Sequence, residues 1–482
     1  MSAMHDSAMN NVYHQVLTRL LSYFSRAERT ALQLLIQRLL VAAGGPERME
    51  HFKVLLAHTG TQDSCYSLAL LRAAQLSIAT RSPATFHLRV ATLRMGTTTP
   101  AIMDSIHRSY GALFVYDDPR VEVLMVDNRE VLPFSHLPAL SDAGREWNRY
   151  SLLLLGHLRE TGSPYEACDD GYLATGEFYG QMSRWQGGVD ALVGGATARQ
   201  QRQFLAGLAR AAQRANLPTL AEPALSMDGL LNSLELLDND CYHALYAEQK
   251  TVAWRPQADF DARRGTTFID IQDLVTGNAQ ERWPLLNEFF GLQAEDAGLA
   301  LRENDYASAL LSAHCRGLQA SYLEGQPYER GFAHYVQRGL LLMRKRGVPE
   351  PICQQASAPY DNPLALAERR IEANAELQQS LGLSETQLVC LLFSPFVGQG
   401  AGLEKFLRRC HPGMLVAMGE LHKALQGEAA PEQVMHWMVD VSGLPINLMR
   451  VLYRRRPVLE AGVPVSSGGD VVQSLNALSA RP

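Results

Sequence analysis

The chain has 482 residues, of which 46% are hydrophobic and 20% are charged, and its net charge is −6. This length predicts two to four domains, because one domain usually takes roughly 100–200 residues. The ordinary composition argues against a disordered chain, and the acidic balance argues against a protein that coats nucleic acid or adheres to an anionic membrane. No apolar run reaches the ~18 residues of a transmembrane helix, so no membrane partner is expected.

The cysteines and the N-terminus bear on the compartment. Seven cysteines are scattered without a C-x-x-C pair, which argues against a zinc ribbon or a disulfide framework and predicts a cytoplasmic protein with reduced thiols. The first residues, MSAMHDSAMNNVYHQ, lack the basic and apolar regions of a Sec signal, and we interpret them either as a frayed terminus or as an uncleaved secretion signal. Of 44 basic residues only five are lysine, which indicates a GC-rich bacterial gene and makes any single arginine weak evidence for function.

Residues 1–84 predict an N-terminal helical segment. Ser25 and Glu28 have the spacing of a capping box, and two glycines followed by a proline at 44–46 end that helix. Two further helices are predicted, in PERMEHFKVLLAHTG (46–60) and in SCYSLALLRAAQLSIAT (64–80).

Residues 85–140 predict a small α/β element. The alternation of Phe86, Leu88 and Val90 is typical of a strand, and TTTPAIMDSIHRSYG (97–111) predicts a short helix with a proline in its first turn. The stretch GALFVYDDPRVEVLMVDN (111–128) predicts a hairpin that turns at Asp117–Pro119. The order β-α-β-β over 85–135 predicts a small sheet with a helix on one face.

The remainder of the chain predicts a central helical domain (141–350), a C-terminal helical domain (351–460) and a flexible tail (461–482). A helix is predicted at 141–162, loops and short helices in the Gly- and Tyr-rich stretch 164–195, and either a brief strand or a loop at 265–277. Further helices are predicted at 196–217, 226–250, 280–292, 303–324, 327–346, 361–381, 384–393, 402–411, 413–427, 431–441 and 445–456. The predicted fold class is therefore mainly α, with bundle-like helical domains and a small α/β insert near 85–135.

Three threonines at a helix start are a candidate anion site. Thr97, Thr98 and Thr99 follow a predicted strand and precede a helix that begins at Pro100. Helix N-termini present free amides and a positive dipole end, so a phosphate or a carboxylate fits there. The alternative is that Thr99 is only the N-cap of the helix. The segment lacks the Gly-Lys-Ser/Thr of a Walker loop.

Two other motifs are weaker. PFVGQGAGLEKF (395–406) spaces its glycines as G-x-G-x-G, but Ser384 and Gln387 form a capping box that predicts a helix before it, so we interpret the motif as a helix–helix connection and expect no cofactor. His411, Met414, Met418 and His422 follow one helical face. Methionine stripes usually fill cores, so no metal is predicted.

The Gly-rich stretch CDDGYLATGEFYGQ (168–181) holds the most plausible catalytic groups. It contains side chains that are common in active sites, namely Cys168, Asp169, Asp170, Glu177 and Tyr179. No G-x-S-x-G or H-E-x-x-H signature accompanies them. We favour a surface loop, and the catalytic residues stay unassigned because triads are defined in space rather than by spacing.

Residues 431–456 resemble a helix–turn–helix over about 20 residues, with Gly443 at the turn. Asn447, Arg450 and Arg454 share one face of the second helix and are side chains that read adenine and guanine edges, while Arg455 suits a phosphate contact. Val439 argues against the resemblance, since a small residue is usual at that position. The alternative is an ordinary pair of antiparallel helices with an arginine-rich outer face.

By elimination, the sequence predicts a bacterial, cytoplasmic regulatory or adaptor protein that acts through contacts with a protein partner or with a second copy of itself. A helix–turn–helix regulator that binds DNA through 431–456 is the first alternative. An enzyme acting on an anionic or phosphorylated small molecule is the second.

Overall fold

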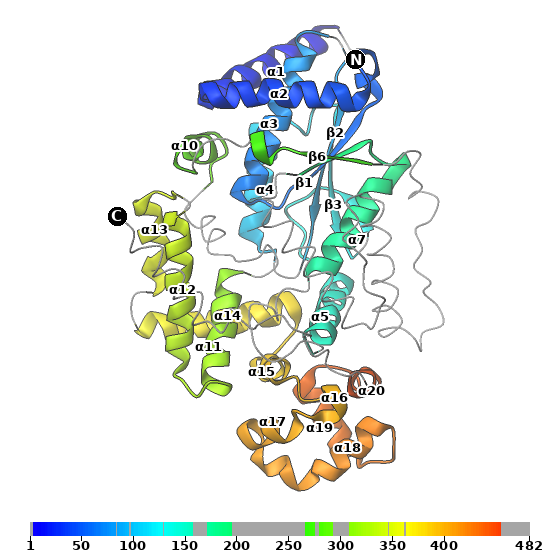
Figure 1. The fold of residues 1–482 in the computed structure, drawn as a ribbon, viewed down its shortest axis with the longest axis vertical. Helices are drawn as coiled ribbons and strands as arrows, with labels where there is room; N and C mark the ends of the chain where they lie inside the picture. The colour runs from blue at the N-terminus through cyan, green and yellow to red at the C-terminus, as the bar shows by residue number, and fades with distance from the viewer. Residues whose placement is uncertain are drawn as a thin grey trace.

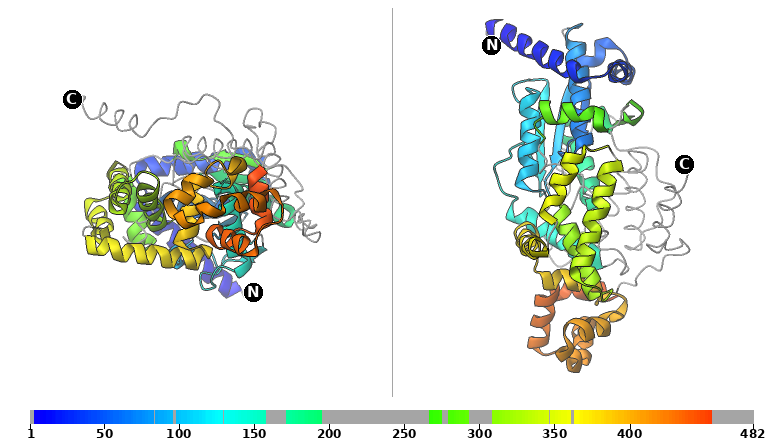
Figure 2. Two further views of the ribbon diagram at one scale, coloured as in Figure 1. Left: turned by 90° about the horizontal axis from the view of Figure 1, so that it is seen from below. Right: turned by 90° about the vertical axis from the view of Figure 1, so that its left-hand side faces the viewer.

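The computed structural model describes residues 3–82, 84–95, 98–128, 130–157, 171–194, 266–274, 279–292, 308–345, 347–360 and 363–454. Over these ranges the protein is mainly α-helical with a small α/β part, which confirms the predicted fold class. The α/β part and the helices α15–α20 lie at opposite ends of the molecule (Figure 1). The right-hand view of Figure 2 shows the same separation of α15–α20 from the first two helices.

The sheet of the α/β part has six strands within the described ranges, in the order β4-β3-β2-β1-β5-β6. All neighbouring pairs are parallel except β3 and β4. The strands are β1 (Lys53–Ala57), β2 (His87–Leu93), β3 (Val121–Asp127), β4 (Glu130–Pro133), β5 (Ala191–Gly194) and β6 (Thr267–Asp270). The chain moves outward from β1 to β3 on one side and returns to the other side of β1 for β5, which is the doubly wound arrangement.

Helices cover both faces of the sheet, as a parallel sheet requires. On one face lie α3 (Gln62–Ala79) and α4 (Pro100–Ala112), with α1 (Ala3–Tyr23) and α2 (Arg26–Ala43) packed outside α3. On the other face α7 (Gly171–Arg184) buries Phe178 and Met182 against Leu55 and Leu192 (Figure 1). Because both faces are covered, β1 and β2 are buried almost throughout.

The helix predicted at 46–60 is wrong. Residues Pro46–His51 form the short 3-10 helix η1, and Lys53–Ala57 form β1, the central strand. A four-residue apolar run such as Val54–Ala57 fits a buried strand as well as a buried helix, so local periodicity does not separate the two. The 1–84 segment that was predicted to be helical therefore supplies the centre of the sheet.

The β-α-β-β order predicted for 85–135 is confirmed by β2, α4, β3 and β4, but the predicted hairpin turn is misplaced. The antiparallel pair is β3 with β4, and the chain turns between Asp127 and Glu130. Residues before Asp118 end α4 and form a turn in which Phe114 has a φ of 50°. Of the residues that suggested a first hairpin strand, Leu113 and Val115 are fully buried, whereas the aromatic side chains of Phe114 and Tyr116 are exposed.

The predicted helices after residue 280 are confirmed within the described ranges, mostly to within a few residues at each end. The elements outside the sheet layer are α5 (Asp142–His157), η2 (Trp185–Gly187), η4 (Gln272–Leu274), α10 (Ala279–Pro284), η5 (Leu285–Phe289), α11 (Ala309–Tyr322), α12 (Tyr328–Lys345), α13 (Glu350–Ser357), η7 (Ala358–Tyr360), α14 (Pro363–Leu381), α15 (Glu385–Phe393), α16 (Val397–Gly400), α17 (Leu403–Cys410), η8 (Pro412–Ala417), α18 (Met418–Gln426), α19 (Glu432–Ser442) and α20 (Ile446–Arg454). The strand alternative for 265–277 is confirmed by β6. The helices predicted at 196–217 and 226–250 and the tail 461–482 lie outside the described residues.

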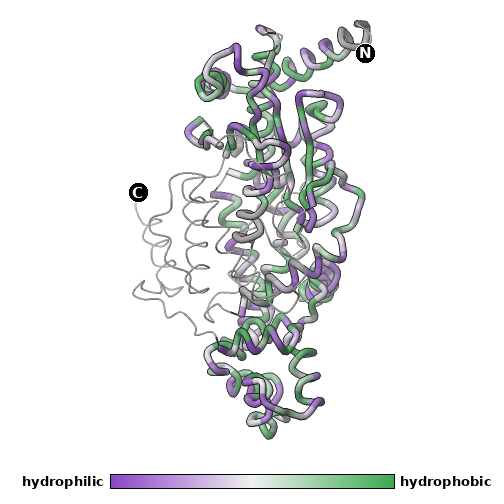
Figure 3. The backbone as a smooth tube through the Cα atoms, turned by 90° about the vertical axis from the view of Figure 1, so that its right-hand side faces the viewer, coloured by the Kyte–Doolittle hydropathy of each residue, from purple (hydrophilic) through white to green (hydrophobic). Residues whose placement is uncertain are grey.

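Local sequence signals explain why the helices begin and end where they do. Ser25 with Glu28 and Ser384 with Gln387 both form complete capping boxes. Gly44 and Gly443 end α2 and α19 in the left-handed conformation that glycine favours. Polar and apolar stretches alternate along the helices in Figure 3, as expected where one face packs against a core. None of the described helices is both long and apolar enough to cross a membrane.

A close helix crossing in the helical part gives a first prediction. A Cβ on Gly331 of α12 would lie 2.5 Å from the backbone carbonyl oxygen of Arg316 in α11, and backbone does not move aside easily. We expect Gly331→Ala to lower the free energy of unfolding by about 1–3 kcal/mol, as overpacking does. Gly419→Ala is the matched control, since a Cβ there meets nothing within 4 Å and alanine favours helix. Urea unfolding of both variants tests this, and equal stabilities would contradict the close crossing.

Candidate anion-binding site

The strands β1, β2, β3, β5 and β6 all end at one edge of the sheet, which we call the carboxyl edge. In doubly wound sheets, ligands bind outside this edge, near the point where the strand order reverses. Here the order reverses between β1 and β5. The carboxyl edge faces α5 and the helical part of the molecule (Figure 1). The polar side chains that follow the strands are therefore the first candidates for a functional site.

Arg94 follows β2 directly and continues its pairing with β3. Its backbone N–H donates to the carbonyl of Val126 at 2.9 Å, which places Arg94 beside Asp127 at the ends of neighbouring strands. Thr92 contacts Tyr110 of α4 at 3.3 Å, and side chains two residues apart on a strand share a face. Arg94 therefore points to the side of the sheet that α4 covers.

The guanidinium of Arg94 is buried and has donors without acceptors. The residue is 7% exposed, and neither Nε nor Nη1 has a hydrogen-bond partner among the residues that the structure describes. Burial lowers the pKa of this guanidinium, and the Asp127 carboxylate offsets part of that shift. Arginine nevertheless stays protonated at neutral pH, so the site holds a buried positive charge. Buried charges are normally paired, because an unpaired one is costly.

Asp127 lies beside Arg94 but bonds to Ser141 instead. Its oxygens accept from the backbone N–H of Ser141 at 3.1 Å and from the Ser141 hydroxyl at 2.7 Å. Within the described ranges no ion pair joins Asp127 to Arg94. The donors of Arg94 are consequently available to an anion that approaches the carboxyl edge.

Thr98 and Thr99, two of the three predicted threonines, lie at the same edge, and their hydroxyls already accept hydrogen bonds. Thr99 is the N-cap of α4, and its hydroxyl accepts from the N–H of Ile102 at 3.4 Å, which confirms the capping alternative. The hydroxyl of Thr98 accepts from the N–H of Met95 at 3.1 Å. Thr97 lies outside the described residues. This segment therefore contributes the N-terminus of α4 to the site, and not the threonine hydroxyls.

The loop between β1 and α3 adds a second helix N-terminus at the carboxyl edge. Thr61 caps α3 by accepting from the N–H of Ser64. Gly60 has a φ of 74°, and a Cβ on it would lie 3.0 Å from Ile106 of α4, so only glycine lets the loop pack this closely. The two helix N-termini are thereby held side by side.

His58, at the end of β1, is fully buried beneath this loop. Its ring packs on Tyr110 with centroids 5.2 Å apart, Nε2 lies 3.5 Å from the Cys65 sulfur, and Nδ1 has no partner within the described residues. Burial lowers the pKa of His58 to about 3, so the ring is neutral at physiological pH. Both side chains are inaccessible, since His58 and Cys65 are 0% exposed.

The sequence reasoning missed Arg94. Its only sequence signal is a cation directly after an apolar strand, in HLRVATLRM, and 39 arginines make that signal weak. Arg89, within β2, is also buried but is paired with Glu122 at 2.6 Å. Only the tertiary structure separates the paired arginine from the one without a partner.

The catalytic groups suggested in 168–181 are not assembled at the carboxyl edge within the described residues. Cys168, Asp169 and Asp170 lie outside the described ranges, and α7 begins at Gly171. Tyr179 contacts Phe178, on the opposite face of the sheet from Arg94.

The structure describes the two weaker motifs. The G-x-G-x-G segment follows helix α15, and Gly398 and Gln399 adopt left-handed conformations, which confirms the helix–helix connection. In the predicted His/Met stripe, His411 precedes the helix, and His422 hydrogen bonds the Tyr453 hydroxyl at 2.9 Å. In the described part of the chain, no three His, Cys, Asp or Glu side chains are grouped to hold a metal.

The helix pair predicted at 431–456 is present as α19 and α20, joined at Gly443. Arg450 is half-buried, and its Nε donates to the carbonyl of Ala424 at the end of α18 at 2.9 Å. Asn447 is half-buried, Arg454 is exposed, and Arg455 lies outside the described residues. Arg450 is thus committed to an internal contact. DNA binding by this pair remains a prediction, and the absence of binding to genomic fragments at low salt would refute it.

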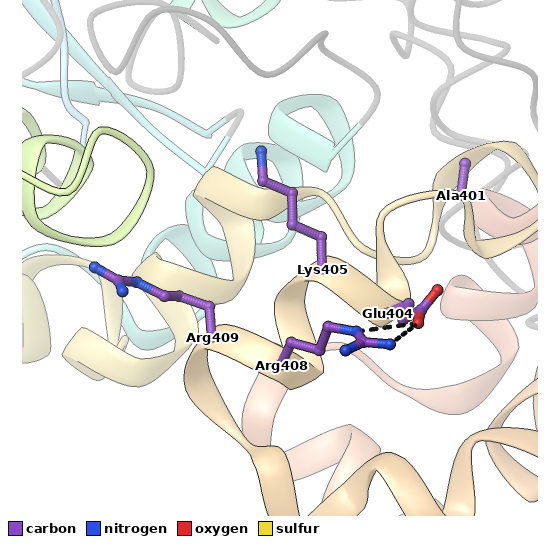
Figure 4. A pocket seen from close by; sticks show the side chains of 5 residues that line it. All are labelled: Ala401, Glu404, Lys405, Arg408 and Arg409. Atoms are coloured by element: carbon purple, nitrogen blue, oxygen red, sulfur yellow. Dashed lines mark hydrogen bonds and ion pairs between the residues drawn. The ribbon is translucent and has the colours of Figure 1, made fainter.

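A hollow of about 440 Å³ on α17 also gathers cations (Figure 4). Arg408 donates to Glu404 at 2.6 Å, and Arg409 donates to the carbonyl of Ser321 at 2.8 Å. The side chain of Arg408 is 69% exposed, so water and salt screen its charge. This surface attracts an anion much less strongly than a buried guanidinium does.

The fold and the carboxyl edge together define a doubly wound α/β module joined to a helical part. Comparison with known proteins finds no matching family model, no matching curated protein and no matching solved structure.

Proposed function

We propose that the protein binds a small molecule bearing a phosphate or carboxylate group at the carboxyl edge, with Arg94 as the principal anion contact. The observation that carries the proposal is the buried guanidinium of Arg94 with unpaired Nε and Nη1 donors, within the described residues, at the edge where doubly wound sheets bind ligands. The N-terminus of α4 adds its positive dipole end beside it.

The energetics favour an anionic ligand over a structural role for Arg94. A hydrogen bond to a charged group contributes about 1.5–3 kcal/mol, which corresponds to roughly a ten- to hundredfold gain in affinity. A buried unpaired charge destabilises the free protein by a comparable or larger amount. A buried charge whose donors have no hydrogen-bond partner among the described residues is typical of a binding site.

The proposal concerns binding and includes no covalent step. Cys65 and His58 form the nearest pair of reactive groups, 3.5 Å apart, but both are fully buried. The regulatory role predicted from the sequence fits such a site, because a bound anion would then serve as a signal. The enzyme alternative shares the same ligand chemistry.

Arg94→Gln tests the proposal because it is expected to lower the affinity for the anion without lowering the stability of the unliganded protein. We expect at least a tenfold loss of affinity for the anion, and an unliganded variant that is as stable as the parent or more stable, because the unpaired charge is gone. Thermal shift and calorimetric titration with inorganic phosphate, pyrophosphate, citrate, sugar phosphates and nucleotides measure both effects. Arg94→Lys, which keeps the charge, is expected to retain part of the affinity.

Arg408→Gln is the matched control, since it removes an exposed cation outside the carboxyl edge. It is expected to bind like the parent. The proposal is wrong if no anion in the panel stabilises the parent, or if Arg94→Gln binds as tightly as the parent does.

A further inference from the structure

Helix α5 begins at the candidate anion site. Ser141 caps it by accepting from the N–H of Gly144 at 3.0 Å, while the same hydroxyl donates to Asp127 at 2.7 Å. A Cβ on Gly144 would lie 2.5 Å from the Asp127 carboxylate, so the acid lies against the first turn of α5. Asp127 is therefore shared between the cap of α5 and the field of the neighbouring Arg94.

The second half of α5 is embedded in the C-terminal helices. Leu153 is fully buried, and its Cδ1 lies 3.2 Å from where a Cβ on Gly443 would be. A Cβ on Gly156 would lie 2.7 Å from Cδ1 of Leu391 in α15. The α15 side chain Gln387 donates to the carbonyl of Asp440 in α19 at 3.1 Å. The turn between α19 and α20 thus rests on α5 and α15 together.

One rigid element therefore joins the anion site to the helix pair α19–α20. With 16 residues, α5 spans about 24 Å at 1.5 Å per residue. An anion that pairs with Arg94 offsets the charge of the guanidinium and so weakens its attraction for Asp127. The Asp127 carboxylate then interacts mainly with Ser141, the cap of α5. A carboxylate at a helix N-terminus stabilises the helix. We therefore expect α5 to be more stable in its packed position when the anion is bound.

We infer that anion binding at Arg94 increases the local stability of the turn between α19 and α20. The coupling runs through Asp127, the Ser141 cap and α5. The inference rests on the proposed function and adds a regulatory effect to it: the bound ligand stabilises the helix pair α19–α20 at the far end of the molecule. The coupling has a physical basis because the ligand changes the interactions of a group that also caps the connecting helix.

Hydrogen–deuterium exchange of the full-length chain tests the coupling, read in peptides covering residues 439–449. In the parent protein, saturating inorganic phosphate is expected to slow exchange there by at least threefold. Ser141→Ala is expected to speed exchange there at least threefold without ligand and to abolish the slowing by phosphate. Ser25→Ala, which removes the equivalent cap from α2 on the α/β part, is the matched control and is expected to leave these peptides unchanged.

The outcomes separate the two proposals. If phosphate binds the parent through Arg94 but exchange at 439–449 stays the same, the coupling is overturned and the binding site stands. If Ser141→Ala and Ser25→Ala exchange alike in these peptides, the path through α5 is overturned whether or not ligand is present. If no anion binds the parent, the proposed function itself fails, and the regulation built on it fails too.

Discussion

Replacing Asp118 by asparagine is expected to lower the free energy of unfolding by about 3–5 kcal/mol, because it leaves Arg72 charged and buried without its partner. The side chains of Arg72 and Asp118 are both 0% exposed, and their nearest atoms are 2.8 Å apart. Burial alone would raise the pKa of Asp118, but the hydrogen bond from Arg120 and the charge of Arg72 outweigh burial and lower that pKa. The variant would also leave two arginines facing each other.

The Arg72–Asp118 ion pair connects α3 to the turn that precedes β3. Arg72 also donates to Gln75 at 2.7 Å and to the carbonyl of Leu113 at 3.2 Å, so its charge is held by several groups at once. Urea unfolding measures the loss of stability. Replacing both partners, as in Arg72→Met with Asp118→Leu, is expected to cost less, since both fully buried charges are removed and only Arg120, whose side chain is 23% exposed, loses its partner.

Asp142→Asn is the matched control for the buried pair. Asp142 bonds Arg145 at 2.6 Å, but its side chain is 92% exposed, and exposed ion pairs contribute little. We expect a change below about 1 kcal/mol. Equal losses for Asp118→Asn and Asp142→Asn would contradict the burial of the Arg72–Asp118 pair.

The second large effect is a loss of stability in acid that comes from His58 and His157. Both histidines are fully buried, and burial lowers the pKa of each to about 3. In the unfolded chain their pKa lies near the ordinary value of about 6.5. Between these values the unfolded chain binds protons that the folded protein does not, so stability is complete above about pH 6.5 and falls as the pH drops toward about 3.

The expected slope reaches about 1.4 kcal/mol per pH unit for each histidine. His157→Phe is expected to remove the contribution of His157 from the slope, because the phenylalanine ring lies beside Phe396, whose ring is 5.9 Å from that of His157, and takes up no proton. It also removes two ring nitrogens that have no partner within the described residues. Urea unfolding at several pH values between about 7 and about 5 measures the slope.

His436→Gln is the control for the acid effect. The side chain of His436 is 71% exposed, so its replacement is expected to leave the slope unchanged. A parent-like slope in His157→Phe would show that His157 does not remain neutral in the folded protein.

The two large effects come from groups whose burial and pairing could not be predicted from the sequence. Asp118 was interpreted as a turn residue, and it does end a turn, but its partner Arg72 lies 46 residues away in α3. His58 lies in a segment that was predicted to be helical. Neither burial nor pairing across such distances leaves a local pattern.

The sequence by itself determined the helices of the C-terminal half and the β-α-β-β order of residues 85–135. These depend on local signals: the capping box at Ser384, the left-handed stop at Gly443, and the change from helical to strand periodicity near Phe86. Such signals act between residues a few positions apart, so they can be read from the chain directly.

Only the tertiary structure decided the centre of the sheet and the candidate site. Val54–Leu56 form a strand because they pair with Leu88–Val90 on one side and Ala191–Val193 on the other, from segments that are distant in the chain. Arg94, directly after β2, and Arg89, within β2, are distinguished by what lies beside each of them after folding. Pairing and burial depend on the packing of the whole chain, because their free energy comes from contacts that no local stretch contains.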